Sequence, residues 1–103
     1  MKGKFYSIEI SEEAENDFDN SYEFYYYDSL KIADTFFQHI NISLENIKRT
    51  PLSFPEVHKN LRKYTVKKFS FVIYYQVAVY TIKVIAIFHT NRNPEVWNER
   101  VEE

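Results

Sequence analysis

The pattern of apolar and polar positions in the first half of the chain predicts one short strand followed by two helices. Residues 5–10 alternate between apolar and polar side chains, which is the period-two pattern of a strand. Ser11 precedes two glutamates and is a typical helix N-cap, while Asp28 and Ser29 suit the start of a second helix. The predicted buried side chains are Ala14, Phe18, Tyr22 and Tyr25 or Tyr26 in the first helix, and Ala33, Phe36, Phe37, Ile40, Leu44 and Ile47 in the second. Because the gap between them is so short, the two helices must form a hairpin.

The second half of the chain changes from helical spacing to the pattern of strands. Pro51 and Pro55 prevent the second helix from continuing, so residues 50–60 are predicted to form a loop. Three stretches rich in β-branched and aromatic residues then predict three successive strands, at 61–66, 69–77 and 81–88. Their succession implies an antiparallel meander. The last turn must lie within 77–80, although this segment contains none of the Gly, Asn or Asp that tight hairpins favour.

Together these elements predict a single α+β domain over residues 1–103, with the order β-α-α-β-β-β. The helical hairpin is expected to pack on a small, mostly antiparallel sheet. Residues 84–88 are all apolar, so the last strand is predicted to be buried on both faces. A polar loop with His89 and Arg92 follows it, and such a loop at the end of a buried strand is where a small domain places a working surface.

Composition narrows the class of function. Aromatic residues make up 18% of the chain, which predicts a core built from aromatic rings. The only glycine is Gly3, which excludes the glycine-rich loop of nucleotide-binding enzymes. Cysteine is absent and the three histidines lack the spacing of metal ligands, so neither a cofactor nor a metal is expected. No signal peptide or membrane-spanning run is visible, which predicts a cytoplasmic protein with no membrane contact.

Charge is distributed unevenly between the two halves. Residues 1–47 hold three Lys and ten Asp or Glu, whereas residues 48–103 hold ten Lys or Arg and five Glu. This distribution has two interpretations. Either an acidic helical half folds beside a basic sheet half and the charges have no role in binding, or the second half binds a negatively charged partner.

Two groups of side chains in the basic half are candidates for binding or catalysis. His89 and Arg92 suit a general base and an anion clamp; alternatively, they tie the closing loop to the acidic helical half. The other cations surround a strand rich in aromatic residues, and this mixture suits nucleic-acid phosphates and bases, or simply a solvated strand edge. They are His58, Lys59, Arg62, Lys63, Lys67 and Lys68.

The order of several short motifs resembles the RelE/ParE superfamily of bacterial toxins, over nearly the whole chain. The motifs are I-S-x-x-A at Ile10, Ser11 and Ala14, the pair Tyr25/Tyr26, P-x-x-F-P at Pro51, Phe54 and Pro55, the single Arg62, F-x-F-V-I-Y-Y from Phe69 to Tyr75, and H-x-x-R-x-P-x-x-W at His89, Arg92, Pro94 and Trp97. The resemblance implies the toxin of a type II toxin–antitoxin module, which serves plasmid stabilisation, chromosome maintenance or a stress response. A cognate antitoxin protein would neutralise it, and any DNA contact would be made only through that antitoxin.

Within this superfamily two activities compete. RelE-like members are ribosome-dependent endoribonucleases that cut mRNA, whereas ParE-like members poison DNA gyrase without cleaving RNA. This chain departs from the nuclease pattern, because Phe71 and Val72 stand where nucleases commonly carry Arg or His and the C-terminus lacks their terminal His-Tyr or Tyr cluster. The resemblance therefore favours a ParE-like gyrase inhibitor that is not an enzyme.

Two alternatives remain open. In an endoribonuclease, Arg62 and Arg92 would stabilise the charge on the scissile phosphate. His89 would accept the proton of the 2′-hydroxyl or donate one to the leaving oxygen. In a degenerate relative, only antitoxin binding would be retained. For either target, the residues expected to bind it are Lys59, Arg62, Lys63, Lys67, Lys68 and Arg92.

Overall fold

The computed structural model describes residues 6–92 and 99–101. Its elements are β1 (Ser7–Ile10), α1 (Glu12–Asp28), α2 (Leu30–Arg49), β2 (Glu56–His58), β3 (Leu61–Val66), a 3-10 turn (Lys68–Ser70), β4 (Phe71–Ala78) and β5 (Thr81–His89). Serine caps begin both helices, as predicted: Ser11 Oγ accepts a hydrogen bond from Ala14 N at 3.0 Å, and Ser29 Oγ accepts from Lys31 N at 3.1 Å. Ser29 alone separates the helices, so they form the predicted hairpin.

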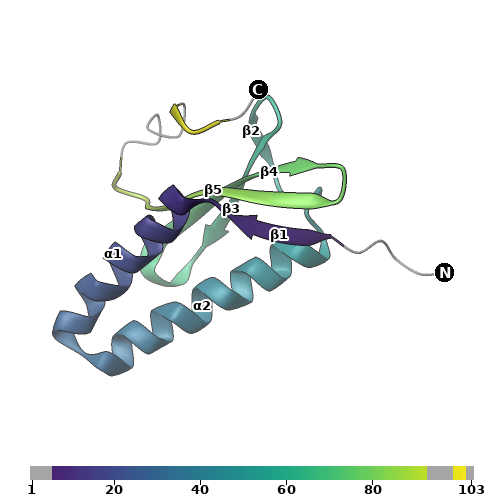
Figure 1. The fold of residues 1–103 in the computed structure, drawn as a ribbon. Coiled ribbons are helices and arrows are strands. Elements are labelled where there is room, and N and C mark those ends of the chain that lie inside the picture. The colour runs from purple at the N-terminus through teal and green to yellow at the C-terminus, as the bar shows by residue number, and fades with distance from the viewer. Residues whose placement is uncertain (1–5, 93–98, 102–103) are drawn as a thin grey trace.

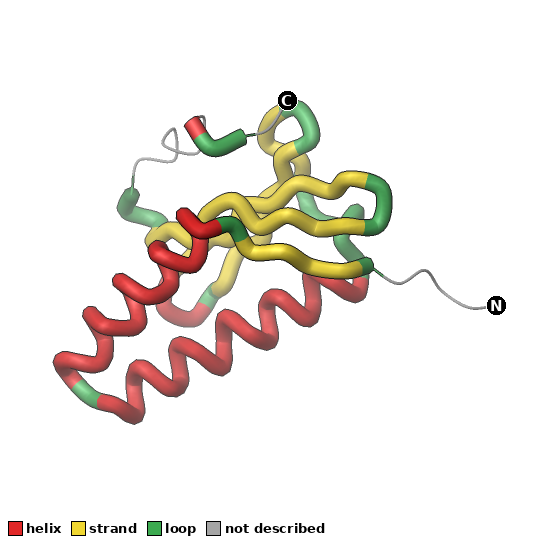
Figure 2. The backbone as a smooth tube through the Cα atoms, viewed as in Figure 1, coloured by secondary structure: helices red, strands yellow, loops and turns green. Residues whose placement is uncertain are grey.

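The strands form one five-stranded sheet in the order β1-β5-β4-β3-β2. The pair β1 and β5 is parallel, and the other three pairs are antiparallel. The helical hairpin packs on one face of this sheet, and neither α1 nor α2 lies on the opposite face (Figures 1 and 2). The predicted α+β class and the mostly antiparallel sheet are therefore confirmed. We refer to the face away from α1 and α2 as the open face.

Aromatic rings fill the space between the helices and the sheet, as the composition predicted. Phe36 of α2 is fully buried and stacks on Phe18 of α1 at 5.5 Å between ring centroids. Its other neighbours include Phe71 of β4 at 4.9 Å and Tyr25 at 5.1 Å. Each such ring contributes roughly 1.5–3 kcal/mol when fully buried, so this cluster is the main link between hairpin and sheet.

Strand β5 lies between β1 and β4 and is buried along residues 84–88, as predicted. A β-bulge interrupts its pairing with β4, because Tyr74 pairs with Ala86 whereas Tyr75 pairs with Val84. The extra residue shifts the side-chain alternation by one position, so that Val84 and Ile87 both pack in the core beneath the helices. Ile85 and Phe88 accordingly lie on the open face.

Two sequence-based predictions are wrong in detail. Part of the predicted loop 50–60 forms β2, a three-residue strand at the edge of the sheet. Every side chain of β2 is exposed, so its sequence lacks the alternation of apolar and polar residues that predicts a strand. In α2, Phe37 is 45% exposed rather than buried, because it lies on the side of the helix that faces α1 at the outer surface of the hairpin.

Two other details refine the sequence prediction. In α1, Tyr25 and not Tyr26 contacts the core. The turn within 77–80 falls at Val79 and Tyr80, and Val79 adopts a positive φ of 56°. None of the helices in the described ranges is long and apolar enough to cross a membrane.

Candidate functional site

His89 is the last residue of β5, and its ring lies toward the helices. It pairs with Phe71 of β4, and the two rings meet edge to face at 5.4 Å between centroids. Phe71 belongs to the core beneath the helices, so the bulge in β5 has turned His89 to that side. Nδ1 of His89 accepts a hydrogen bond from Asn91 N at 3.0 Å. This bond leaves Nε2 as the nitrogen available to another group, beside a hollow that Ser21 and Tyr25 of α1 also line.

Arg92 lies near the opposite side of the same strand. Its guanidinium stands 4.3 Å over the ring of Phe88, which belongs to the open face, and forms an ion pair with Asp17 of α1 at 3.6 Å. The Arg92 side chain is 45% exposed, so one side of the guanidinium faces solvent. Arg92 thus combines a contact to the acidic helix with access to an external partner.

Asp17 is the centre of a larger cluster that the sequence did not predict. It is 8% exposed, and its Oδ2 accepts hydrogen bonds from Ile87 N at 3.1 Å and from Arg100 Nη1 at 2.7 Å. Arg100 Nη1 also donates to Ile85 O at 3.3 Å. The cluster therefore occupies the edge of β5 beyond the end of β1 and joins α1, β5 and the C-terminal segment.

Arg62 of β3 has a structural environment distinct from that of His89 and Arg92. Its Nη1 donates to the carbonyl oxygens of Leu52 at 3.3 Å and Phe54 at 2.7 Å, and its Nη2 lies 3.9 Å from Glu56. Its cross-strand partner is Tyr75, which is fully buried in the core beneath the helices. Arg62 therefore holds the segment that leads into β2, on the opposite face of the sheet from Phe88.

Lys63, the next residue, points to the open face. It pairs with Tyr74 of β4 and, with Arg92, Phe88 and Thr90, lines a cavity of about 220 Å³. Burial raises the pKa of Tyr74 above its usual value, so its phenol remains neutral in this wall. Among the predicted site residues, Lys63 and Arg92 are brought together here, and His89 borders the same cavity.

The remaining predicted cations do not join this cavity. Lys59 is exposed before β3 begins, whereas Lys67 and Lys68 are exposed after it ends. At about 3.3 Å per residue, the six residues of β3 place roughly 20 Å of strand between Lys59 and Lys67. Pro94 and Trp97 lie outside the described residues. The cations that the sequence grouped together are therefore distributed along a strand, and only Lys63 lines the open-face cavity with Arg92.

The sequence contained one signal for the missed Asp17. It lies three residues after Ala14, which is fully buried, and so belongs to the inward stripe of α1. A buried carboxylate requires a cationic partner or hydrogen-bond donors, so a buried Asp17 predicts a cation from another part of the chain beside it.

Comparison with known proteins decides the family. The family described as "ParE toxin of type II toxin-antitoxin system, parDE" matches residues 8–94. The chain belongs to the ParE toxin family. Membership makes it the toxin of a type II toxin–antitoxin system, with a cognate ParD antitoxin as its partner.

Structural comparison agrees with membership in the ParE family. The solved structure described as "Chromosomal ParDE TA system from P. aeruginosa" superposes with a TM-score of 0.71 at 18% sequence identity. The match covers 82% of this chain and 96% of that one, so the shared fold extends over nearly the whole ParE-like domain. No curated protein matches the chain.

Proposed function

We propose that this ParE-family toxin arrests growth by binding DNA gyrase and does not cleave RNA. The observation that supports the proposal is the separation of the two arginines that a nuclease would need, because Arg62 lies apart from the cavity that Arg92 and His89 line. Arg62 is bound to loop carbonyls on the helix side of the sheet, whereas Arg92 stands over Phe88 at the open face. His89 is turned toward α1 by the bulge.

RNA cleavage by side chains requires the general base and both cations to meet at one phosphate. A general base must lie within about 3 Å of the oxygen whose proton it removes, while the cations must surround the same phosphate. With Arg62 and Arg92 on opposite faces, one phosphate cannot contact both guanidinium groups. This geometry favours a toxin that acts through a binding surface.

The open-face cavity is the surface that we assign to the target. Lys63 and Arg92 supply two positive charges, and Tyr74 and Phe88 supply aromatic walls between them. Arginine and aromatic residues are enriched at protein interfaces, and cations at their rim direct the approach of an acidic partner. A gyrase surface with exposed carboxylates fits this chemistry.

The test is inhibition of purified gyrase by the toxin, measured as loss of DNA supercoiling. The variant Lys63→Ala/Arg92→Ala is expected to lose inhibition by tenfold or more, at an unchanged melting temperature. Lys59→Ala/Lys67→Ala removes the same charge outside the cavity and serves as the matched control. Equal inhibition by both variants and the wild type would overturn the assignment of the cavity.

A further inference from the structure

Two arginines share the buried carboxylate of Asp17 beside β5. Arg100 binds it with both terminal nitrogens, because its Nη1 lies 2.7 Å from Oδ2 and its Nη2 lies 3.4 Å from Oδ1. Nη1 of Arg92 lies 3.6 Å from the same Oδ1. Both guanidinium groups also stand over the ring of Phe88, at 4.3 Å for Arg92 and 5.0 Å for Arg100. Within the described part of the chain, this cluster therefore combines two positive charges with one carboxylate.

The two arginines hold Asp17 unequally. The Arg100 side chain is 14% exposed, and its Nη1 also donates to Ile85 O at 3.3 Å. The Arg92 side chain is 45% exposed, and its distance to Asp17 is longer than the roughly 2.7–2.9 Å of a charge-assisted hydrogen bond. An exposed ion pair of this length contributes little, whereas a partly buried bidentate pair is strong. Arg100 is therefore the main counterion of Asp17, and Arg92 is the arginine that the carboxylate releases more easily.

Arg92 also lines the open-face cavity of about 220 Å³, together with Lys63 and Thr90. An acidic side chain of a partner that enters this cavity interacts with both cations, Lys63 and Arg92. Asp17 competes with that side chain for the Arg92 guanidinium. The result of the competition depends on how much negative charge Asp17 presents to Arg92, because the Coulomb attraction is proportional to that charge. Arg100 neutralises most of it.

We propose that Arg100 is a positioning residue that keeps Arg92 available to an acidic partner at the open face. The inference rests on the proposed function, because we take that partner to be gyrase. Without the charge of Arg100, Arg92 is the one remaining cation that pairs with Asp17 among the described residues. The attraction is strong because Asp17 is buried, so Arg92 turns from the cavity to Asp17. The toxin then loses affinity, although Arg100 is not one of the described residues that line the cavity.

A purely structural role of Arg100 predicts a different result when Asp17 is also replaced. Arg100 joins the C-terminal segment to α1 and β5, so its loss also lowers stability. Asp17→Asn removes the charge that captures Arg92 and retains an acceptor for Ile87 N. A positioning role therefore predicts that Asp17→Asn restores the activity of an Arg100 variant. A structural role predicts no restoration, because the second substitution removes a further contact.

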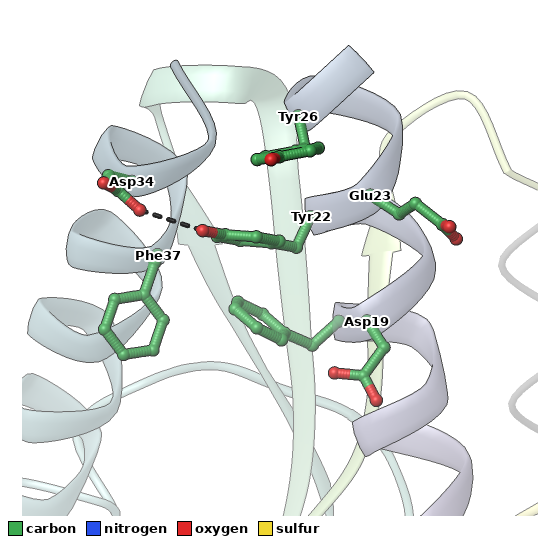
Figure 3. Close-up of a pocket in the computed structure, with 7 residues that line it drawn as sticks. Asp19, Tyr22, Glu23, Tyr26, Asp34 and Phe37 are labelled. Carbon is green, nitrogen blue, oxygen red and sulfur yellow. Dashed lines mark hydrogen bonds between the residues drawn. The ribbon is translucent and has the colours of Figure 1, made fainter. Parts of the chain in front are cut away.

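Asp19 provides the matched control for this restoration. It lies two residues further along α1, is exposed, and lines the hollow between α1 and α2 with Tyr22 (Figure 3). Asp19→Asn makes the same change in charge as Asp17→Asn, at a carboxylate that forms no ion pair with Arg92 or Arg100. It should leave the activity of an Arg100 variant unchanged.

The test measures inhibition of gyrase supercoiling at low salt, at a temperature where circular dichroism shows every variant to be folded. Arg100→Gln keeps a hydrogen-bond donor, loses the charge and is expected to inhibit about three- to tenfold less than wild type, since Lys63 remains in the cavity. Arg100→Lys keeps the charge and should stay within about twofold of wild type. Arg100→Gln/Asp17→Asn should also return to within about twofold, whereas Arg100→Gln/Asp19→Asn should remain as weak as Arg100→Gln.

The position of Arg92 is measured separately from gyrase, by the nitrogen–proton NMR signal of its Nε–H group. This signal should shift in Arg100→Gln and return toward its wild-type position in Arg100→Gln/Asp17→Asn. An unchanged signal would overturn the inference, as would a loss of inhibition that Asp17→Asn fails to restore or that Asp19→Asn restores equally. If wild-type toxin leaves gyrase active, the proposed function fails, and the NMR shifts alone then support or overturn the competition between Arg100 and Arg92 for Asp17.

Discussion

The buried carboxylate of Asp17 yields the most quantitative prediction. Replacement by alanine removes the acceptor of two short hydrogen bonds, from Ile87 N at 3.1 Å and from Arg100 Nη1 at 2.7 Å. Both partners stay in place, since Ile87 is buried in β5 and the Arg100 side chain is only 14% exposed. The variant thus has an unpaired amide and an uncompensated guanidinium at the edge of the sheet.

The expected cost follows from the burial of these groups. Removing one partner of a buried ion pair costs about 3–5 kcal/mol, and an amide left without an acceptor is part of that cost. For a domain of about 100 residues, each kcal/mol lowers the melting temperature by about 4 °C. Asp17→Ala should therefore melt about 12–20 °C below the wild type. Asp17→Asn retains an acceptor for Ile87 N and loses the charge, so we expect a smaller loss of about 1.5–3 kcal/mol.

Urea and thermal unfolding followed by circular dichroism measure both changes. Asp19→Asn is the matched control, because Asp19 lies two residues further along α1 and is exposed, so its effect should stay within about 0.5 kcal/mol. A double-mutant cycle of Asp17→Asn with Arg100→Met should give a coupling energy above about 1 kcal/mol. A loss below about 1 kcal/mol for Asp17→Ala would refute the assignment of Asp17 as the link between α1, β5 and the C-terminal segment.

Three further predictions concern the sheet and its loops. Burial raises the pKa of Tyr75 to about 12, above its unfolded value of 10.0, so its contribution to stability is present below pH 10 and is lost as the pH rises toward 12. In Tyr75→Phe, the urea midpoint should therefore fall less between pH 10 and pH 12 than in the wild type, and an equal fall would contradict this prediction. At neutral pH the variant should lose about 1 kcal/mol of unfolding free energy, because the hydrogen bond to Pro51 O is lost. Val79→Asn should raise stability by about 0.5–1 kcal/mol, because asparagine tolerates the positive φ, while Val79→Thr, which keeps the β-branch, should bring no gain in the same unfolding assay. Arg62→Ala should lower the free energy of unfolding by about 1.5–3 kcal/mol through loss of its carbonyl contacts, yet the folded protein should inhibit gyrase normally; selective loss of inhibition would refute this.

Most of the fold followed from local physical signals. The serine caps and the helical spacing located both helices, because a hydroxyl acceptor and an apolar stripe are properties of the local sequence. The dense β-branched runs located β3, β4 and β5 in the same way. Strand β2 was missed because backbone pairing with β3 defines it, while its own side chains are exposed and carry no pattern.

The candidate site was harder to predict, because it depends on the bulge in β5. Strict alternation from Val84 would place His89 on the open face beside Arg92, where a catalytic pair is easy to imagine. The single extra residue in β5 reverses the side chains that follow it, and His89 contacts Phe71 instead. A shift of this kind arises from pairing with β4, and the composition of β5 gives no sign of it. The partner of Asp17, Arg100, is likewise 83 residues distant in sequence, so only the folded chain brings them together.

We propose that this ParE-family toxin acts on gyrase through a binding surface and does not cleave RNA. The most direct measurement places the purified toxin in two parallel assays, gyrase supercoiling of plasmid DNA and cleavage of mRNA on translating ribosomes. We predict loss of supercoiling with intact mRNA. Cleavage of mRNA with normal supercoiling, where the cleavage is abolished by His89→Ala at an unchanged melting temperature, would contradict the proposal.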